Sequence, residues 1–160
     1  MSSFSGQGEP GPGGDELGLG GVGFLLGAAH RAHRRQWEAQ LADLGVSAPQ
    51  AAVLRAIAAE PGQGVRGIAR RIGTDPMNAQ RIIESLLAAG LCQAGHDPGD
   101  ARRRPLHPTP EGGRVAEEVA GRARLAERHL ADTLGEEGYR SLLAALEILI
   151  GDARYEQGPG

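Results

Sequence analysis

The sequence of 160 residues contains no lysine, one cysteine and only 3 % aromatic residues. The single cysteine, Cys92, cannot form an internal disulfide, which favours a reducing compartment and predicts a cytoplasmic location. No apolar run reaches the roughly 18 residues that a membrane-spanning helix needs, so no membrane association is expected. Because aromatic residues are scarce, we expect a core of leucine, isoleucine, valine and alanine, as in many helical folds.

Glycine is abundant, with 26 residues, and it is unevenly distributed. Residues 1–23 are rich in Gly, Ser and Pro and have no apolar periodicity, which predicts a disordered tail. This segment has no basic start followed by an apolar core, so it does not match a signal peptide. The remaining length favours a single domain over residues 24–154.

The formal net charge of −3 argues at first against nucleic-acid binding, but the position of the charges matters more than their sum. The tail and the C-terminal part are acidic, whereas arginine dominates the middle of the chain. Arginine suits bidentate contacts to phosphate and guanine. The middle contains Arg55, Arg66, Arg70, Arg71, Arg81, Arg102, Arg103 and Arg104, which outnumber Glu60, Asp75, Glu84, Asp97 and Asp100.

Apolar periodicity predicts two helices before the arginine-rich segment. The first runs from Phe24 to Leu44 and ends at Gly45, as helices commonly do. The second begins after Ser47, a natural N-cap, with Pro49 in its first turn, and stops at the Pro-Gly pair at 61–62.

Two short helices then follow in close succession. Within residues 65–72 the apolar residues recur at helical spacing, which predicts a helix with one buried side, and Gly73 ends this helix. After a tight turn, Asp75 is placed to cap a helix that starts at Pro76 and runs to about Ala89. Two short helices joined by a glycine-containing turn predict a helix-turn-helix.

A polar turn between two short extended pieces comes next. Residues 91–94 and 105–108 are the candidate strands, and residues 96–104 form a Gly-, Asp- and Arg-rich connection, which together predict a hairpin, or wing. Pro105 and Pro108 predict that the second strand is short or lies at an edge. Thr109 then caps a long helix that reaches about Leu134, and a final amphipathic helix follows Gly135.

This order of elements resembles the MarR family of bacterial regulators. The segments that carry the resemblance are Ile68 to Gly73, the helix from Pro76 to Gly90, and the run from Asp97 to Arg104 that leads to Thr109. The family's wing contains Asp-x-Arg and ends at Leu-Thr-x-x-Gly before a long helix. Here Asp100-x-Arg102 and Thr109-x-x-Gly112 match, whereas Pro108 stands where the family usually has leucine.

The resemblance implies a mainly α-helical fold with a small β-hairpin wing. It implies a winged helix-turn-helix over residues 46–109 and dimerisation helices over residues 24–44 and 110–154. It also implies a homodimer that places two recognition helices in successive major grooves of a pseudo-palindromic double-stranded DNA operator. The acidic C-terminal helices would then lie away from the DNA.

The candidate DNA contacts come from the fourth helix and the wing. Asn and Gln suit adenine, Arg suits guanine, and an arginine in the wing suits a narrow minor groove, with Asp100 orienting an arginine. The alternative is that these residues only form solvated surfaces. The set is Pro76, Met77, Asn78, Gln80, Arg81, Asp100, Arg102, Arg103 and Arg104.

His30, His33 and Trp37 share one face of the first helix. In MarR-like proteins small aromatic or phenolic ligands bind beside this helix, so these three residues are the candidate effector contacts. The alternative is that Trp37 belongs to the dimer core. His129 with the two other histidines would make a weak zinc set, and we expect neither a metal nor a cofactor. Cys92 is interpreted as a small buried hydrophobic residue.

The function predicted is a DNA-binding transcriptional regulator, usually a repressor, that an aromatic or phenolic ligand releases. The alternative is a winged-helix interaction or dimerisation module that does not bind DNA. An enzyme is not expected, because the sequence presents no nucleophile with a base, no paired carboxylates in a plausible cleft and no metal cluster.

Overall fold

The computed structural model describes residues 20–96, 99 and 104–156, with side chains up to residue 151. Two compact units divide the chain between Ala48 and Pro49, and each is described by itself. Residues 1–19 of the predicted tail lie outside the described part.

The first unit contains helix α1 (Val22–Leu41) and a 3-10 turn, η1 (Ala42–Leu44). The helix begins two residues before the predicted start, because the backbone N–H of Leu25 already donates to the carbonyl oxygen of Gly21 at 3.1 Å. A glycine in an exposed turn weakens a helix by about 0.5–1 kcal/mol but does not prevent it. The glycine-rich composition therefore led to a predicted start that is too late. Gly45, at φ 67°, ends the segment as predicted.

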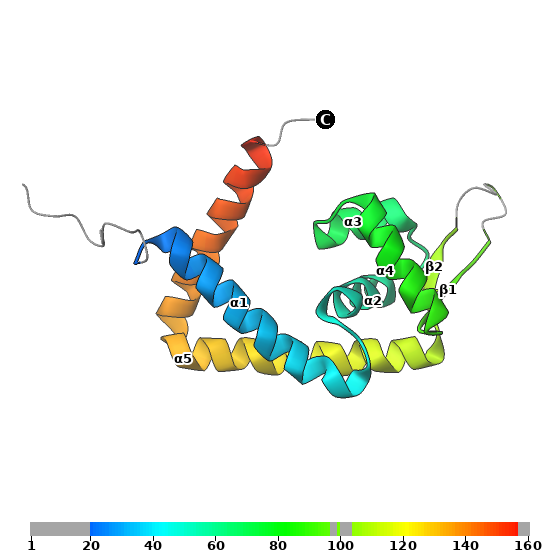
Figure 1. Cartoon of the computed structure of the whole chain (residues 1–160), viewed down its shortest axis with the longest axis horizontal. Helices are drawn as coiled ribbons and strands as arrows, with labels where there is room; N and C mark the ends of the chain where they lie inside the picture. The colour runs from blue at the N-terminus through cyan, green and yellow to red at the C-terminus, as the bar shows by residue number, and fades with distance from the viewer. Residues whose placement is uncertain (1–19, 97–98, 100–103, 157–160) are drawn as a thin grey trace, which may run out of the picture. The chain divides into compact units, whose positions relative to one another are not determined.

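The second unit is built on three helices: α2 (Ala48–Ala59), α3 (Val65–Ile72) and α4 (Pro76–Ala88). The bounds of α3 and the start of α4 agree with the sequence-based prediction. The three helices lie together in Figure 1, and each contributes aliphatic side chains that are at most 2 % exposed. This core includes Ala51, Val53, Leu54, Ile57, Ile68, Ala69, Ala79, Ile83 and Leu86.

The predicted wing forms a two-stranded antiparallel hairpin, β1 (Cys92–Ala94) and β2 (Leu106–Pro108), with Gln93 opposite His107. Both strands have three residues, so the expected short second strand is confirmed. The backbone of Leu106 forms hydrogen bonds on the side of β2 that faces away from β1. Its N–H donates to the Gln63 carbonyl at 2.9 Å, and its carbonyl accepts from Gly62 at 2.8 Å. The loop before α3 therefore covers the outer edge of the hairpin.

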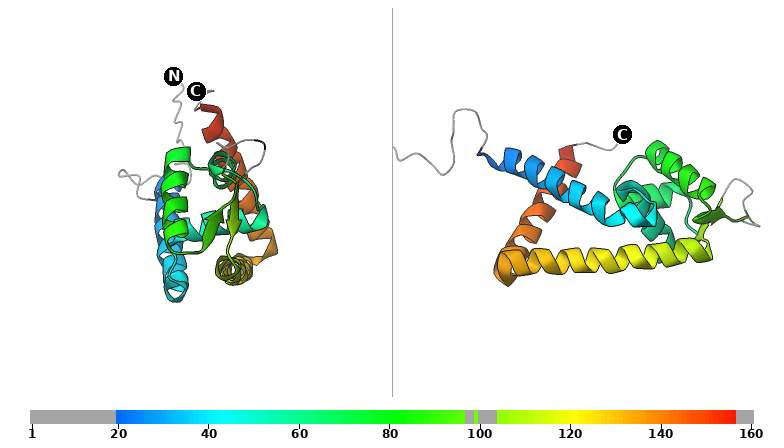
Figure 2. Two further views of the ribbon diagram at one scale, coloured as in Figure 1. Left: turned by 90° about the vertical axis from the view of Figure 1, so that its right-hand side faces the viewer. Right: turned by 60° about the horizontal axis from the view of Figure 1, so that its bottom comes forward.

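Helix α5 (Pro110–Glu156) follows the hairpin directly. Gly135 has φ 70° and ψ 161°, which interrupts the helix where the sequence predicts a boundary, and α5 changes direction part-way along its length in Figure 2. Val115, Ala116 and Val119 near its start are at most 5 % exposed. Among the described residues, no helix combines the length and the hydropathy that crossing a bilayer requires.

Candidate nucleic-acid interface

The turn between α3 and α4 determines which residues of α4 face outward. Gly73 has φ 72° and donates its backbone N–H to the carbonyl of Ala69, which ends α3 in a left-handed conformation that favours glycine. Asp75 then caps α4, because its Oδ1 accepts from the backbone N–H of Asn78 at 2.8 Å. Pro76 occupies the first turn, where it leaves no helical hydrogen bond unmade. The predicted cap is therefore confirmed.

Asn78 is half-buried and joins this turn to the outer face of α4. Its Nδ2 donates to Thr74 Oγ1 at 2.9 Å, and its Oδ1 accepts from a terminal guanidinium nitrogen of Arg81 at 2.8 Å. The side chain that the sequence suggests for adenine contacts therefore already makes one hydrogen bond from its amide nitrogen and one to its amide oxygen within the protein. The sequence pattern gives no sign of this arrangement, since it depends on the conformation of the turn.

Three other predicted residues of α4 are exposed on its first two turns. Met77 is 84 % exposed, although it is apolar, and Pro76 and Arg81 also lie in solvent. Behind them, Ala79 and Ile83 are buried and fix this face of the helix outward. An exposed methionine beside an arginine can contact a thymine methyl group and a guanine edge in a major groove.

Gln80, the remaining candidate on α4, is exposed and donates from Nε2 to Glu84 Oε1 at 2.7 Å. Glu84 was not among the predicted site residues, yet it lies on the exposed side of the helix. Its position three residues after Arg81 could have indicated it, because residues three apart lie on one side of a helix. Gln80 thus points along α4 and is held by a carboxylate.

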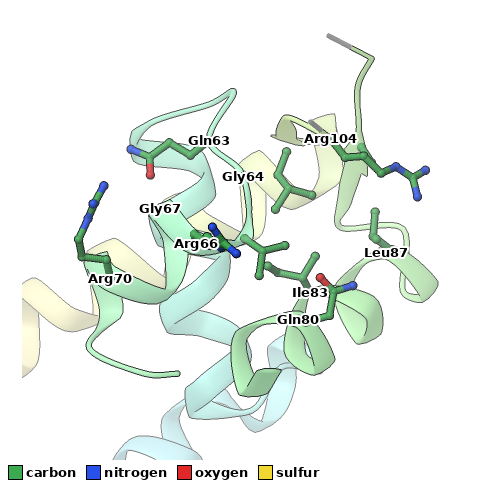
Figure 3. Close-up of a pocket in the computed structure, with 12 residues that line it drawn as sticks. Gln63, Gly64, Arg66, Gly67, Arg70, Gln80, Ile83, Leu87 and Arg104 are labelled. Atoms are coloured by element: carbon green, nitrogen blue, oxygen red, sulfur yellow. The ribbon is translucent and has the colours of Figure 1, made fainter. Parts of the chain in front are cut away.

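A cleft of about 920 Å³ lies between α3, α4 and the hairpin. Arg66 and Arg70 come from α3, Arg104 comes from the base of the wing, and Gln80 contributes from α4. Figure 3 shows Arg70 and Arg104 toward opposite ends of the group, with Arg66 between them. The sequence-based site omitted Arg66 and Arg70, although their spacing of four residues on a short helix places both on one side.

The wing is described only at its base. Arg104 is exposed and lies next to β2, in agreement with a role at the surface. The other predicted wing contacts, Asp100, Arg102 and Arg103, lie outside the described residues.

The junction of the hairpin with α5 is closely hydrogen-bonded around Thr109. Its Oγ1 donates to the carbonyl of Gly90 at 2.7 Å and accepts from the N–H of Gly112 at 3.0 Å, so it caps α5 as predicted. Its backbone N–H donates to the carbonyl of Leu91 at 3.1 Å. The end of α4, the end of the wing and the start of α5 therefore meet at one threonine.

Position 112 requires glycine, because any larger residue would collide with the neighbouring backbone. A Cβ at this position would lie 1.7 Å from the carbonyl oxygen of Leu91, which is backbone and cannot move aside as a side chain can. The spacing Thr109-x-x-Gly112, noted in the sequence only as a resemblance, thus has a physical cause. Threonine caps the helix, and glycine allows the first turn of α5 to approach the end of α4.

The candidate effector residues lie on α1 in the first unit. His30 and His33 are exposed, and Trp37 is partly exposed. Within the described ranges, no three His, Cys, Asp or Glu side chains form a group that could hold a metal ion.

Cys92 is 3 % exposed in β1, and burial raises the pKa of its thiol. A raised pKa disfavours the thiolate, which is the reactive form of cysteine. This agrees with the interpretation of Cys92 as a small buried hydrophobic residue.

Comparison with known proteins gives the same fold. The model of the MarR family matches residues 44–103, the segment that contains α2, α3, α4 and β1. This family-model match covers the helix-turn-helix and the first strand of the hairpin. A curated relative, the transcriptional regulator HosA from Escherichia coli O111:H-, is 37 % identical over 84 residues. The match covers 52 % of this chain and 60 % of HosA, which is less than two thirds of that relative.

Two solved structures extend the similarity over most of the chain. The PcaV transcriptional regulator from Streptomyces coelicolor is 28 % identical, covers 84 % of this chain and 97 % of its own, and has a TM-score of 0.69. The transcriptional repressor CouR, bound to a 23-mer DNA duplex, is 25 % identical, covers 85 % and 99 % respectively, and has a TM-score of 0.74. The predicted mainly helical fold with a hairpin wing is confirmed.

Proposed function

We propose that this protein is a MarR-type regulator, a dimeric, sequence-specific DNA-binding transcriptional regulator. The observation that carries the proposal is the outer face of α4, where Met77 and Arg81 are exposed beside a cleft lined by three arginines. The similarity to CouR, a repressor whose solved structure includes a DNA duplex, supports the same use of this fold.

The proposed contacts divide into base contacts and backbone contacts. In the major groove, Arg81 contacts guanine and Met77 contacts a thymine methyl group. Arg66 and Arg70 contact phosphates beside the groove, since phosphate contacts set the position of a protein on DNA. At the wing, Arg104 and the predicted set Asp100, Arg102 and Arg103 approach the neighbouring minor groove.

A homodimer is proposed because α5 exposes aliphatic side chains after Gly135. Leu142, Leu143, Leu149 and Ile150 lie on one side of the helix by their spacing, and each is at least 42 % exposed within the chain. An aliphatic row of this length is costly in water, and a second copy would cover it. A two-fold dimer would present two α4 helices to half-sites about 34–36 Å apart.

The direct test is binding to a duplex selected by the protein from a random library. We expect Arg81→Ala combined with Arg102→Ala to weaken binding at least tenfold, since one base contact contributes about 1–3 kcal/mol. The matched control is Arg124→Ala with Arg128→Ala, which makes the same charge change on exposed positions of α5. Fluorescence anisotropy measures both, and equal affinities for the two double variants would contradict the proposal.

The proposed mode of regulation is repression that a small aromatic or phenolic ligand relieves. Arg66 and Arg104 line the cleft beside α4 together with the apolar residues Ile83 and Leu87, and this mixture of cationic and apolar residues suits an aromatic acid. The second candidate place is the face of α1 that contains Trp37.

A thermal-shift series with benzoate and phenol tests the ligand class, because a ligand that binds the folded state raises the melting temperature. Loss of the shift in Arg66→Ala locates the ligand in the cleft, and loss in Trp37→Ala locates it at α1. A ligand that raises the melting temperature without lowering DNA affinity would contradict relief of repression.

The competing function is an interaction module without DNA binding. In that case the selected duplex and a scrambled one would bind equally weakly, and the two arginine double variants would behave alike. The exposed arginines of α3 and α4 favour the DNA-binding proposal, because a purely apolar interface does not require them.

A further inference from the structure

Asn78 lies between a turn residue and the arginine proposed to contact guanine. Its backbone N–H is bound by Asp75 Oδ1, its Nδ2 donates to Thr74 Oγ1, and its Oδ1 accepts from Arg81. All three bonds measure 2.8–2.9 Å. The side chain is half-buried, whereas Arg81 is exposed.

We infer that Asn78 is a positioning residue that holds Arg81 toward guanine, and that it does not itself contact adenine. A bidentate contact to adenine uses the amide oxygen and the amide nitrogen of asparagine together. Here the nitrogen donates to Thr74 and the oxygen accepts from Arg81, so an adenine contact would have to share or replace both bonds. The inference depends on the proposed DNA binding and identifies what sets the specificity of that site.

The physical reason for such an arrangement is the flexibility of arginine. A free arginine side chain loses much rotamer freedom when it is fixed against a base. A hydrogen bond to Asn78 Oδ1 fixes the guanidinium before DNA arrives, so less freedom is lost on binding. Thr74 in turn fixes the amide, which gives the asparagine one orientation with its oxygen toward Arg81.

The test compares single and double variants on the duplex selected from a random library. The base position contacted by Arg81 is the one whose preference disappears in Arg81→Ala. At that position we expect Asn78→Ala to lower the preference for guanine about fivefold to tenfold while affinity for scrambled DNA stays unchanged. In the double variant, Asn78→Ala adds no further loss to Arg81→Ala, because the asparagine acts through the arginine.

Two further variants separate positioning from a structural role. Asn78→Asp keeps an acceptor for Arg81, so it retains more of the guanine preference than Asn78→Ala does. If Asn78 contacted adenine directly, Asn78→Asp would instead lose an adenine preference, since a carboxylate cannot donate to adenine N7. Thr74→Val removes the partner of Nδ2 and is expected to lower the guanine preference less than Asn78→Ala does. Circular-dichroism melting shows whether each variant is folded.

The outcomes are distinguishable from failure of the proposed function. Additive losses in Asn78→Ala and Arg81→Ala, or loss of an adenine preference in Asn78→Asp, would overturn this inference and leave DNA binding intact. Absence of any salt-sensitive binding by the wild-type protein would overturn the DNA-binding proposal and this inference with it.

Discussion

The two helical segments of α5, before and after the interruption at Gly135, differ sharply. At its start Val115 and Val119 are at most 3 % exposed, and Thr109 and Gly112 tie the first turn to the end of α4. After Gly135, Ile148 is 69 % exposed and Ile150 is 53 % exposed. The first end completes its contacts within the chain, and the second leaves its apolar side chains uncovered.

The difference shows which part of the protein buries its apolar side chains without a second chain. The helix-turn-helix and the hairpin bury most of their aliphatic side chains, and Asp75 caps α4 from within the same segment. The end of α5 contains aliphatic side chains of the kind found in a core, but within this chain they are exposed. We therefore expect contacts within the helix-turn-helix and the hairpin to stabilise the candidate DNA surface. The proposed dimer contacts are expected to lie at the end of α5.

The largest predicted effect is on the buried end of α5. Gly112→Ala places a Cβ 1.7 Å from a backbone oxygen, so we expect a loss of more than about 3 kcal/mol in the free energy of unfolding. Gly113→Ala is the matched control, because a Cβ there meets nothing within 4 Å. The control should stabilise by up to about 1 kcal/mol. Urea unfolding measures both, and similar stabilities would break the comparison.

The next effect concerns the uncovered end. Leu142→Glu with Leu149→Glu places two charges on the exposed apolar side of α5, so we expect the proposed dimer to dissociate into folded monomers. Light scattering after gel filtration measures the mass, and circular dichroism measures the helix content. The control is Arg140→Glu with Glu147→Arg, which alters exposed polar residues nearby. An unchanged dimer mass in the leucine variant would locate the interface elsewhere.

Thr109→Val tests the hydrogen bonds of the junction alone. It removes the cap of α5 and the bond to the carbonyl of Gly90, for an expected loss of about 1–2 kcal/mol. Thr133→Val removes a single bond from an exposed hydroxyl to the carbonyl of His129, and we expect almost no loss. Equal losses at the two positions in urea unfolding would mean that the junction is not specially stabilised.

The smallest effect is a pH dependence at the start of α5. The hydrogen bond from Arg114 lowers the pKa of Glu111, with the charge of that guanidinium acting in the same direction. A lowered folded pKa gives stability that is present above the unfolded pKa, about 4.3, and is lost as pH falls through the folded value.

We therefore expect Glu111→Gln to be slightly less stable than the wild type at neutral pH, with the difference vanishing in acid. The effect is small, because both side chains are exposed. Urea unfolding at a series of pH values measures it. A difference that persists below the folded pKa would mean that charge is not its cause.

Much of this architecture could be predicted from the sequence, because local signals determine it. Asp75 and Pro76 mark the start of α4, and Gly73 and Gly135 mark helix ends where the structure has positive φ values. The start of α1 was predicted two residues late, since glycine weakens a helix without ending it.

What the sequence could not give depends on contacts between segments. The bond of Asn78 to Thr74 depends on the turn, and the need for glycine at 112 depends on the carbonyl of Leu91. Periodicity placed Asn78 on the surface of α4 but could not show that its amide is already bound. The amphipathic pattern at the end of α5 predicts an apolar face, whereas its exposure is visible only once the helix is placed.

The most direct test of the central claim is the salt dependence of binding to the selected duplex, measured beside a scrambled duplex of equal length. We predict that the selected duplex binds at least about 10³-fold more tightly, and that the logarithm of its affinity falls linearly with the logarithm of salt concentration. Equal affinity for the two duplexes, or binding that salt does not weaken, would contradict the assignment of the α4 face as a DNA-binding surface.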